Sequence, residues 1–256
     1  NATTSRESVY IGYLAGGSGV ITGNANTLVG FGAGYDLTSG EQNVIIGKDT
    51  AQNFTDNTHN IVIGNNAMET ANSGENFNIA IGYEALHDLD AGSGDGNVAI
   101  GYQAAKSLSV ANPKNVSIGY QAAQGALTST ESCYIGYESG GSGAITGNEN
   151  TCLGYASGKD LTSGTANVFL GKDAGENVTT GSYNVAIGVN ALEDAVAGNS
   201  YNIAIGHLAL STENSGADSC LAIGYEALKT QNADVINMAI GPQAGDAITD
   251  GNKNTL

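Results

Sequence analysis

The stretch Asn97-Val-Ala-Ile-Gly101-Tyr-Gln-Ala104 decides the fold, because the same eight-residue cassette recurs fourteen times along the chain. The cassette reads Asn, aliphatic, any residue, aliphatic, Gly, two variable residues and a small residue. Its glycines, called anchor glycines below, follow one another at spacings of 17, 18 or 19 residues. They are Gly12, Gly30, Gly47, Gly64, Gly82, Gly101, Gly119, Gly136, Gly154, Gly171, Gly188, Gly206, Gly224 and Gly241. Self-similarity at a fixed period indicates a repeat architecture.

Each cassette predicts a strand rather than a helix. Val98 and Ile100 alternate with Asn97 and Ala99, and this period of two indicates a short strand with one buried face. The Gly-, Ser- and Asn-rich remainder leaves no room for a helix, and helix-pair repeats need roughly 33 residues or more. Residues three positions after the anchors are always small. We therefore predict an all-β fold, a parallel β-solenoid (β-roll or β-helix) of about fourteen coils of 17–19 residues.

A longer period lies over the short one. Residues 8–49 match residues 132–173 at a constant offset of 124 residues. No change of composition marks a domain boundary, so we expect residues 1–256 to form a single repeat array with super-repeat halves 8–131 and 132–256. Asn254-Thr-Leu256 resembles the opening Asn26-Thr-Leu28 of a cassette, and we expect the array to be a fragment of a longer fibre.

An asparagine stands four residues before the anchor glycine in eleven cassettes. Amides stacked at one corner of successive coils can hydrogen-bond along the axis, so the predicted role is a structural asparagine ladder. Ser8, Ser132 and Cys220 take this position in the other three cassettes. The predicted ladder comprises Asn26, Asn43, Asn60, Asn78, Asn97, Asn115, Asn150, Asn167, Asn184, Asn202 and Asn237.

Composition excludes several classes of function. Eight Lys and Arg residues against 25 Asp and Glu residues give a net charge of −17, which repels nucleic acid. No apolar run approaches the ~20 residues of a transmembrane helix, so we expect no membrane insertion. The three Cys and three His residues show no metal-ligand or catalytic spacing. We therefore expect no enzyme activity, no catalytic residue, no cofactor and no metal site.

Acidic residues in one turn leave two alternatives open. Asp88, Asp90 and Asp95 surround the longest spacing between anchors and bring together oxygen atoms of the kind that bind Ca²⁺. The turn lacks the EF-hand and nonapeptide calcium patterns, which favours a solvated, repulsive surface. Paired acids such as Asp88 and Asp90 can also hydrolyse glycosides, and this makes a polysaccharide depolymerase a third, weaker hypothesis.

An aromatic residue directly follows the anchor glycine in eight cassettes. Such side chains either pack at an interchain seam or form a stripe that contacts glycans, since Tyr offers apolar area and a hydroxyl. The residues are Tyr13, Phe31, Tyr83, Tyr102, Tyr120, Tyr137, Tyr155 and Tyr225.

The cassette resembles those of two families. The run Asn78-Ile-Ala-Ile-Gly-Tyr-Glu-Ala85 is similar to the left-handed parallel β-roll head repeats of trimeric autotransporter adhesins. The longer spacing, with Gly, Ser, Thr and Asn in the turns, resembles the repeat arrays of bacteriophage tail fibres. The resemblance implies a homotrimer, located in a virion tail fibre or at an extracellular or cell surface.

Each coil contributes few apolar side chains, so a single chain has a thin core. We therefore expect three chains to associate along their length as a homotrimeric rod. The leading hypothesis is a structural and adhesive shaft of a trimeric fibre, such as a bacteriophage tail fibre that serves host attachment. The alternative is the glycan- or matrix-binding head of a bacterial surface adhesin, whose partner is a host cell-surface glycan.

Overall fold

The computed structural model describes residues 4–17, 19–89, 92–111, 113–141, 143–195, 198–213, 218–231, 236–246, 248 and 251–256. The chain divides into two compact units, unit 1 (Asn1–Thr130) and unit 2 (Glu131–Leu256). This division falls next to the boundary of the 124-residue super-repeat.

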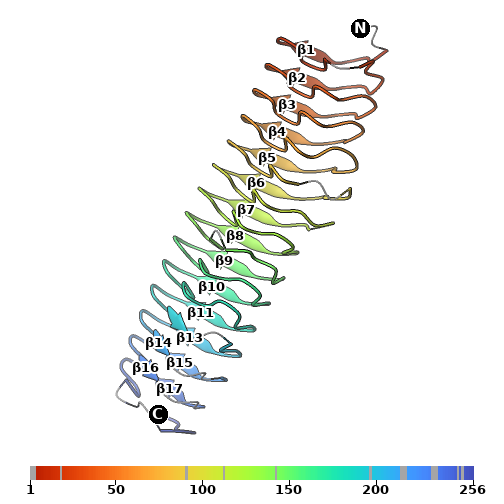
Figure 1. Cartoon of the computed structure of the whole chain (residues 1–256). Coiled ribbons are helices and arrows are strands. Elements are labelled where there is room, and N and C mark those ends of the chain that lie inside the picture. Colours follow the sequence, from red (N-terminus) through yellow and green to blue (C-terminus); the bar gives the residue numbers. More distant parts are fainter. Residues whose placement is uncertain are drawn as a thin grey trace. The chain divides into compact units, whose positions relative to one another are not determined.

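Both units are stacks of coils whose three-residue strands pair in parallel (Figure 1). Unit 1 contains β1 (Val9–Ile11), β2 (Thr27–Val29), β3 (Val44–Ile46), β4 (Ile61–Ile63), β5 (Ile79–Ile81), β6 (Val98–Ile100) and β7 (Val116–Ile118). Unit 2 contains β8 (Cys133–Ile135), β9 (Thr151–Leu153), β10 (Val168–Leu170), β11 (Val185–Ile187), β13 (Ile203–Ile205), β15 (Leu221–Ile223) and β17 (Met238–Ile240). A second, smaller sheet in unit 2 pairs β12 (Asp194–Ala195), β14 (Thr212–Glu213) and β16 (Thr230–Gln231).

The predicted fold class is confirmed. Equivalent cassette residues pair directly, as Val98 with Val116 and Ile100 with Ile118 do, and the described parts of the chain contain no helix. Each anchor glycine directly follows a strand. Cassette positions are numbered below from this glycine, as position 0, so that the asparagine is at −4 and the strand spans −3 to −1.

The anchor glycines are required by a close approach of backbones. Their φ angles lie between 131° and 144°, a region that L-residues with a side chain rarely adopt. A Cβ atom on Gly101 would lie 2.2 Å from the carbonyl oxygen of Gly119 in the next coil. The glycine therefore lets successive coils stack at the corner that ends the strand.

The buried face of the strand is not the one that carries the paired aliphatic residues. Asn97 and Ala99 are buried, whereas Val98 and Ile100 are only partly covered. The small residue Ala104, at +3, is buried as well. It lies between the left-handed residues Gln103 (φ 54°) and Ala105 (φ 47°), which turn the chain over a narrow core. The strand centre and the corner therefore build the core, and positions −3 and −1 face outward.

Candidate functional surface

The predicted ladder asparagines form a hydrogen-bonded column in each unit. All eleven side chains are at most 2% exposed. In unit 2 the Asn167 amide N–H donates to Asn150 Oδ1 at 3.0 Å, and the Asn184 N–H donates to Asn167 Oδ1 at 2.9 Å. Side-chain Nδ2 atoms add bonds of 3.1 Å to the same acceptors. The column therefore satisfies buried backbone N–H groups that the short strands leave unpaired.

The same amides also fasten the turn of the following coil. Asn167 Nδ2 donates to the Gly181 carbonyl at 2.9 Å, and Asn43 Nδ2 donates to the Asn57 carbonyl at 2.7 Å. Ser132 Oγ accepts from the Asn150 N–H at 3.0 Å and so performs part of this role. Each asparagine thus links neighbouring coils, and its surroundings are structural rather than those of a ligand site.

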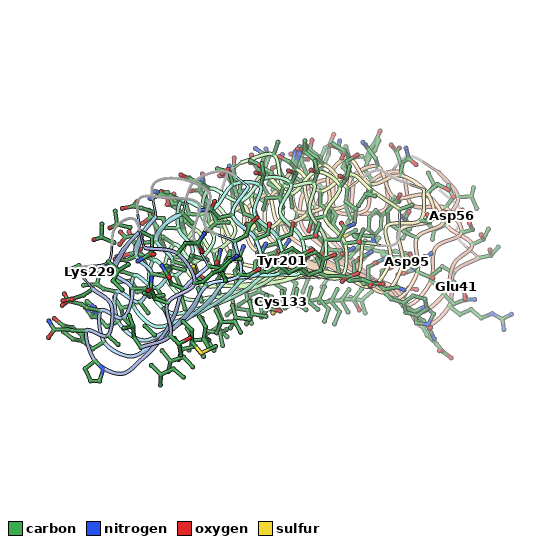
Figure 2. All side chains as sticks on the ribbon, turned by 90° about the horizontal axis from the view of Figure 1, so that it is seen from below. Glu41, Asp56, Asp95, Cys133, Tyr201 and Lys229 are labelled. Carbon is green, nitrogen blue, oxygen red and sulfur yellow. The ribbon has the colours of Figure 1, made fainter. Side chains whose placement is uncertain are left out.

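The outward residues at −3 and −1 form an apolar ridge along each unit. Every member is aliphatic, Cys, Met or Thr, and none is charged. In Figure 2, carbon dominates the sticks beside Cys133, while oxygen and nitrogen gather on the side of the turns. The ridge of unit 1 comprises Val9, Ile11, Thr27, Val29, Val44, Ile46, Ile61, Ile63, Ile79, Ile81, Val98, Ile100, Val116 and Ile118. That of unit 2 comprises Cys133, Ile135, Thr151, Leu153, Val168, Leu170, Val185, Ile187, Ile203, Ile205, Leu221, Ile223, Met238 and Ile240.

The aromatic residues at +1 are exposed and stack on one another. Tyr83 and Tyr102 have ring centroids 5.3 Å apart, and Tyr102 and Tyr120 have centroids 5.0 Å apart. Tyr13 stacks on Phe31 at 5.4 Å, and Tyr137 stacks on Tyr155 at 5.0 Å. Tyr225 lies against His207 in a tilted arrangement. Within a stack the ring faces are covered by neighbouring rings, so the edges and hydroxyls are what these residues offer to a partner.

A second aromatic column, at position −5, was missed in the sequence. His59 stacks on Phe77 at 4.9 Å, and Tyr183 stacks on Tyr201 at 5.1 Å. Phe77 and Tyr201 are 60% and 59% exposed. An alignment of the cassettes extended by one residue before the asparagine would have shown this column.

Lysine side chains are mostly paired with acids at the corners. Lys106 Nζ and Gln103 Nε2 both donate to Glu84 Oε2, the latter at 2.9 Å. Burial raises the pKa of the Glu84 carboxyl, but hydrogen bonds from Lys106, Gln103 and Tyr83 outweigh it and lower that pKa to about 2. The hydrogen bond from Lys106 to Glu84 raises the pKa of Lys106 in turn. The pair stays charged across the physiological range.

The acidic turn is partly described. Asp88 Oδ1 lies 2.5 Å from His87 Nδ1, and Asp95 Oδ1 accepts from the Asn76 N–H at 2.6 Å. Asp90 lies outside the described residues. Within the described ranges no group of three or more His, Cys, Asp or Glu side chains is placed to hold a metal ion.

The three cysteines differ in their burial. Cys133, Cys152 and Cys220 form no disulfide within the described part of the chain, and Cys133 lies on the ridge whereas the other two are buried. Burial raises the pKa of both the Cys133 and the Cys152 thiols.

In the part of the chain that the structure describes, no helix has the length and apolar character needed to cross a membrane.

Comparison of the chain with protein-family models and with curated proteins finds no match.

Proposed function

We propose that this chain is a structural shaft segment of an extracellular trimeric fibre, of the kind that bacteriophage tails use for host attachment. Copies associate along their apolar ridges, and length is set by the number of coils because each coil contacts mainly its neighbours. The observation that carries the proposal is the uncharged ridge on a chain of net charge −17.

The distribution of charge favours a second copy of the chain as the partner of the ridge. Acidic side chains such as Glu84, Asp95 and Asp160 lie in corners and turns rather than in the ridge. Two copies that approach through their turns therefore repel one another, whereas copies that approach through their ridges bury apolar side chains. The same arrangement keeps finished fibres apart.

The free energy gained by burying the ridge side chains is large enough to contribute to assembly. Complete burial of a Val or Ile side chain contributes about 1.5–3 kcal/mol, and a half-exposed one has about 1 kcal/mol still to gain. The ridge of one unit therefore contributes on the order of 10 kcal/mol when covered. This is comparable with the ~4–15 kcal/mol that association costs, so stable assembly requires both units to take part.

The solution mass of the folded chain tests the proposal. Light scattering after size exclusion is expected to give a mass near three chains, with a β-rich circular dichroism spectrum. Ile100→Lys places a charge in the ridge and is expected to weaken the assembly, whereas Ser109→Lys makes the same charge change at an exposed turn residue and leaves it intact. A folded monomer for the unmodified chain would overturn the proposal.

Cys133 provides a test of geometry as well as of mass. If ridges of three copies face one another, the Cys133 thiols of neighbouring copies lie on the same seam. A short bismaleimide is then expected to link copies covalently, and Cys133→Ser abolishes the product. A cysteine moved to the turn, Ser109→Cys in the Cys133→Ser background, is expected to give no linked product.

The exposed columns at +1 support a second candidate function, contact with surface glycans. Tyr83, Tyr102 and Tyr120 present a row of phenol edges on adjacent coils. Binding would then be weak at each coil and strengthened by repetition. A glycan array probed with the folded protein tests this, and signal no higher than that of a Tyr83→Leu/Tyr102→Leu/Tyr120→Leu variant would exclude the column as a binding surface.

A further inference from the structure

The outward face of each coil is wider than the ridge. Side chains alternate between the two faces of an extended segment, and the alternation runs from position −5 to position +1. In the coil of β5, Phe77 at −5 and Tyr83 at +1 are 60% and 43% exposed. Asn78 and Ala80, which lie between them at −4 and −2, are buried. The columns at −5, −3, −1 and +1 therefore share one face, which is at most roughly 20 Å wide.

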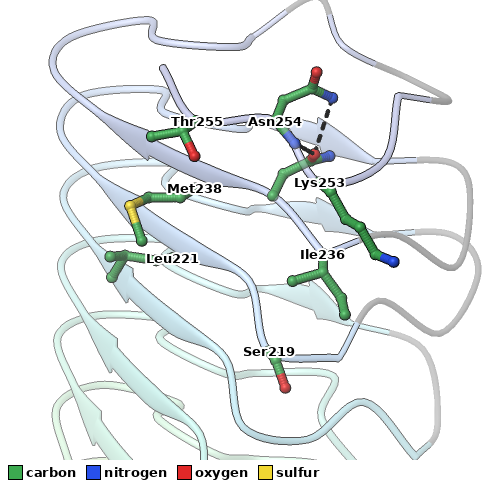
Figure 3. Close-up of a pocket in the computed structure, with 8 residues that line it drawn as sticks. Ser219, Leu221, Ile236, Met238, Lys253, Asn254 and Thr255 are labelled. Carbon is green, nitrogen blue, oxygen red and sulfur yellow. Dashed lines mark hydrogen bonds between the residues drawn. The ribbon is translucent and has the colours of Figure 1, made fainter.

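The columns at −5 and +1, called the outer columns below, border the ridge on opposite sides. Figure 3 shows the −5 and −3 columns side by side in the last coils of unit 2, with an open furrow between them. The −5 column holds Ser219, Ile236 and Lys253 there, and the −3 column holds Leu221, Met238 and Thr255. The +1 residues follow the anchor glycine at the other end of the strand. A copy of the chain that covers the ridge therefore also reaches the outer columns.

Large side chains at −5 gain little within a single chain. Phe77, Tyr183 and Tyr201 have φ angles of 58°, 60° and 63°, in the left-handed region that glycine adopts at lower cost. Stacking pairs each ring with one neighbouring ring, yet all three side chains stay more than half exposed. Contact with a second copy would remove this apolar area from water.

The two outer columns differ in charge. No residue at −3, −1 or +1 is acidic, although the chain has 25 Asp and Glu residues. The +1 column instead contains Lys48 and Lys172. The acids of the face are all at −5 and all exposed, and they are Glu7, Glu131 and Glu149. A −5 column that lies against a +1 column therefore opposes no acid, whatever the register of the coils.

We propose that copies of the chain associate parallel and in register, with the −5 column of one copy packed against the +1 column of the next. This inference rests on the proposed function, because it requires the ridge to face a second copy. Rotation about an axis along the stack brings −5 to +1 at every contact, which makes the interface heterologous. A two-fold axis across the stack brings −5 to −5 and +1 to +1 instead, and so places the glutamate-bearing columns together.

Residues of the same coil complement one another in the parallel arrangement. The three glutamates at −5 share their coils with Tyr13, Tyr137 and Tyr155, whose hydroxyls can donate to a carboxylate of the next copy. Phe77 of one copy meets the ring edge of Tyr83 of the next, a geometry that aromatic pairs favour. The +1 column is then covered in the assembly, so this contact and glycan binding at the same column exclude each other.

Crosslinking of two cysteine variants tests the arrangement. Phe77→Cys and Tyr83→Cys are made in two separately tagged chains that both carry Cys133→Ser, and the two chains are co-expressed. Cys152 and Cys220 are buried and do not react in the folded chain. A short bismaleimide is expected to link one tagged chain to the other. Either variant assembled alone should give no linked product.

Two controls test the level of the contact and its charge. Tyr13→Cys in place of Tyr83→Cys moves the +1 thiol by four coils, about 19 Å along the stack, and should abolish the linked product. In a single chain, Phe77→Glu with Tyr83→Lys should stay assembled, because the opposite charges face one another across the contact. Phe77→Glu with Tyr83→Glu should dissociate.

Light scattering on the same samples separates this inference from the proposed fibre. Linked product from Phe77→Cys alone, or a mass near three chains without the mixed product, would overturn the contact between −5 and +1 and leave the fibre standing. A mass near two chains with the mixed product would support the contact and overturn the three-copy fibre. A monomeric mass for the unmodified chain would overturn both.

Discussion

Unit 2 builds its core in two ways. In the coils of β8 and β10 the strand centre, position −2, is the large residue Tyr134 or Phe169, and in the coils of β11, β13 and β15 it is alanine. Position +4 varies in the opposite sense. It is Gly140 and Gly175 in the first group, and Leu192, Leu210 and Leu228 in the second.

The two positions share one volume. A Cβ atom on Gly175 would lie 2.8 Å from three carbons of the Phe169 ring, and one on Gly140 would lie 2.4 Å from Tyr134. In the coils of β11, β13 and β15, where the strand centre is alanine, a leucine from the corner takes the equivalent position. Interiors pack at a constant density, so in these five coils a change at one position is matched by the opposite change at the other.

The anchor glycine does not take part in this exchange, and its replacement should give the largest effect in either coil type. A Cβ atom on Gly171 would lie 2.5 Å from the Gly188 carbonyl oxygen, and one on Gly206 would lie 2.4 Å from that of Gly224. Gly171→Ala and Gly206→Ala should each destabilise by about 4 kcal/mol or more in urea unfolding. Gly19→Ala, where the nearest atom is 3.7 Å away, serves as the control and should be near neutral. A small effect at either anchor would contradict the close-approach argument.

Exchange of one core type for the other should be the next largest effect. Phe169→Ala leaves a cavity and should cost about 3–4 kcal/mol. Gly175→Leu alone overpacks the same space and should also destabilise. The double variant reproduces the Ala186 and Leu192 arrangement, and Leu192 already adopts the left-handed conformation there (φ 53°). Urea unfolding should therefore show the double variant to be more stable than either single one.

The coupling free energy between the substitutions at positions −2 and +4 shows whether the two side chains share one volume. Contacting residues usually couple by about 0.5–3 kcal/mol, and a stabilising coupling at the upper end is expected here. Leu210→Gly with Ala204→Phe is the reverse exchange and should behave likewise. If the losses of unfolding free energy from the single substitutions simply add in both pairs, the residues at positions −2 and +4 do not share one volume.

The asparagine column runs through coils of both types, including those of β10 and β11, and the loss of one asparagine should destabilise the fold less than either change above. Asn167→Ala leaves the Asn184 N–H and the Gly181 carbonyl without partners and should cost about 2–3 kcal/mol. Asn167→Ser should cost less, because Ser132 shows that a hydroxyl can still accept the N–H of the next coil. Thermal unfolding with hydrogen exchange at Asn184 would measure both variants. Equal losses for Ala and Ser would show that the N–H acceptor contributes little.

Much of the fold followed from the spacing of the anchors, since a period of 17–19 residues with one strand per period has few solutions. Which face of the strand is buried was harder to predict. Val98 and Ile100 are the more hydrophobic residues, yet Ala99 is buried, because the core has room for one small centre beside a corner residue such as Ala105. Alternation of residue types shows that the strand has two different faces, but it does not show which face packs in the core of the chain.

The candidate surface was predicted only in part. The +1 aromatics are visible as a repeat, whereas Tyr201 and Phe77 stand where most cassettes carry a polar or small residue. Three-dimensional register, which stacks Tyr201 on Tyr183 and Phe77 on His59, was needed to find this second column.

The smallest effect is expected at the corner acids of the alanine-centred coils, which occur in both units. Glu84 follows Ala80 in unit 1 as Glu226 follows Ala222 in unit 2, and hydrogen bonds to lysine and glutamine lower the pKa of both carboxyls. For Glu84 the pKa falls from 4.5 to about 2, so its stabilising contribution is complete above the ordinary pKa and is lost as pH falls through about 2. Glu84→Gln should therefore be less stable than the unmodified chain at pH 7, and the gap should close between pH 4.5 and pH 2. Asp160→Asn, at an exposed turn, provides the comparison in the same urea series. A gap that persists unchanged to pH 2 would mean that Glu84 stabilises the corner by packing rather than by its charge.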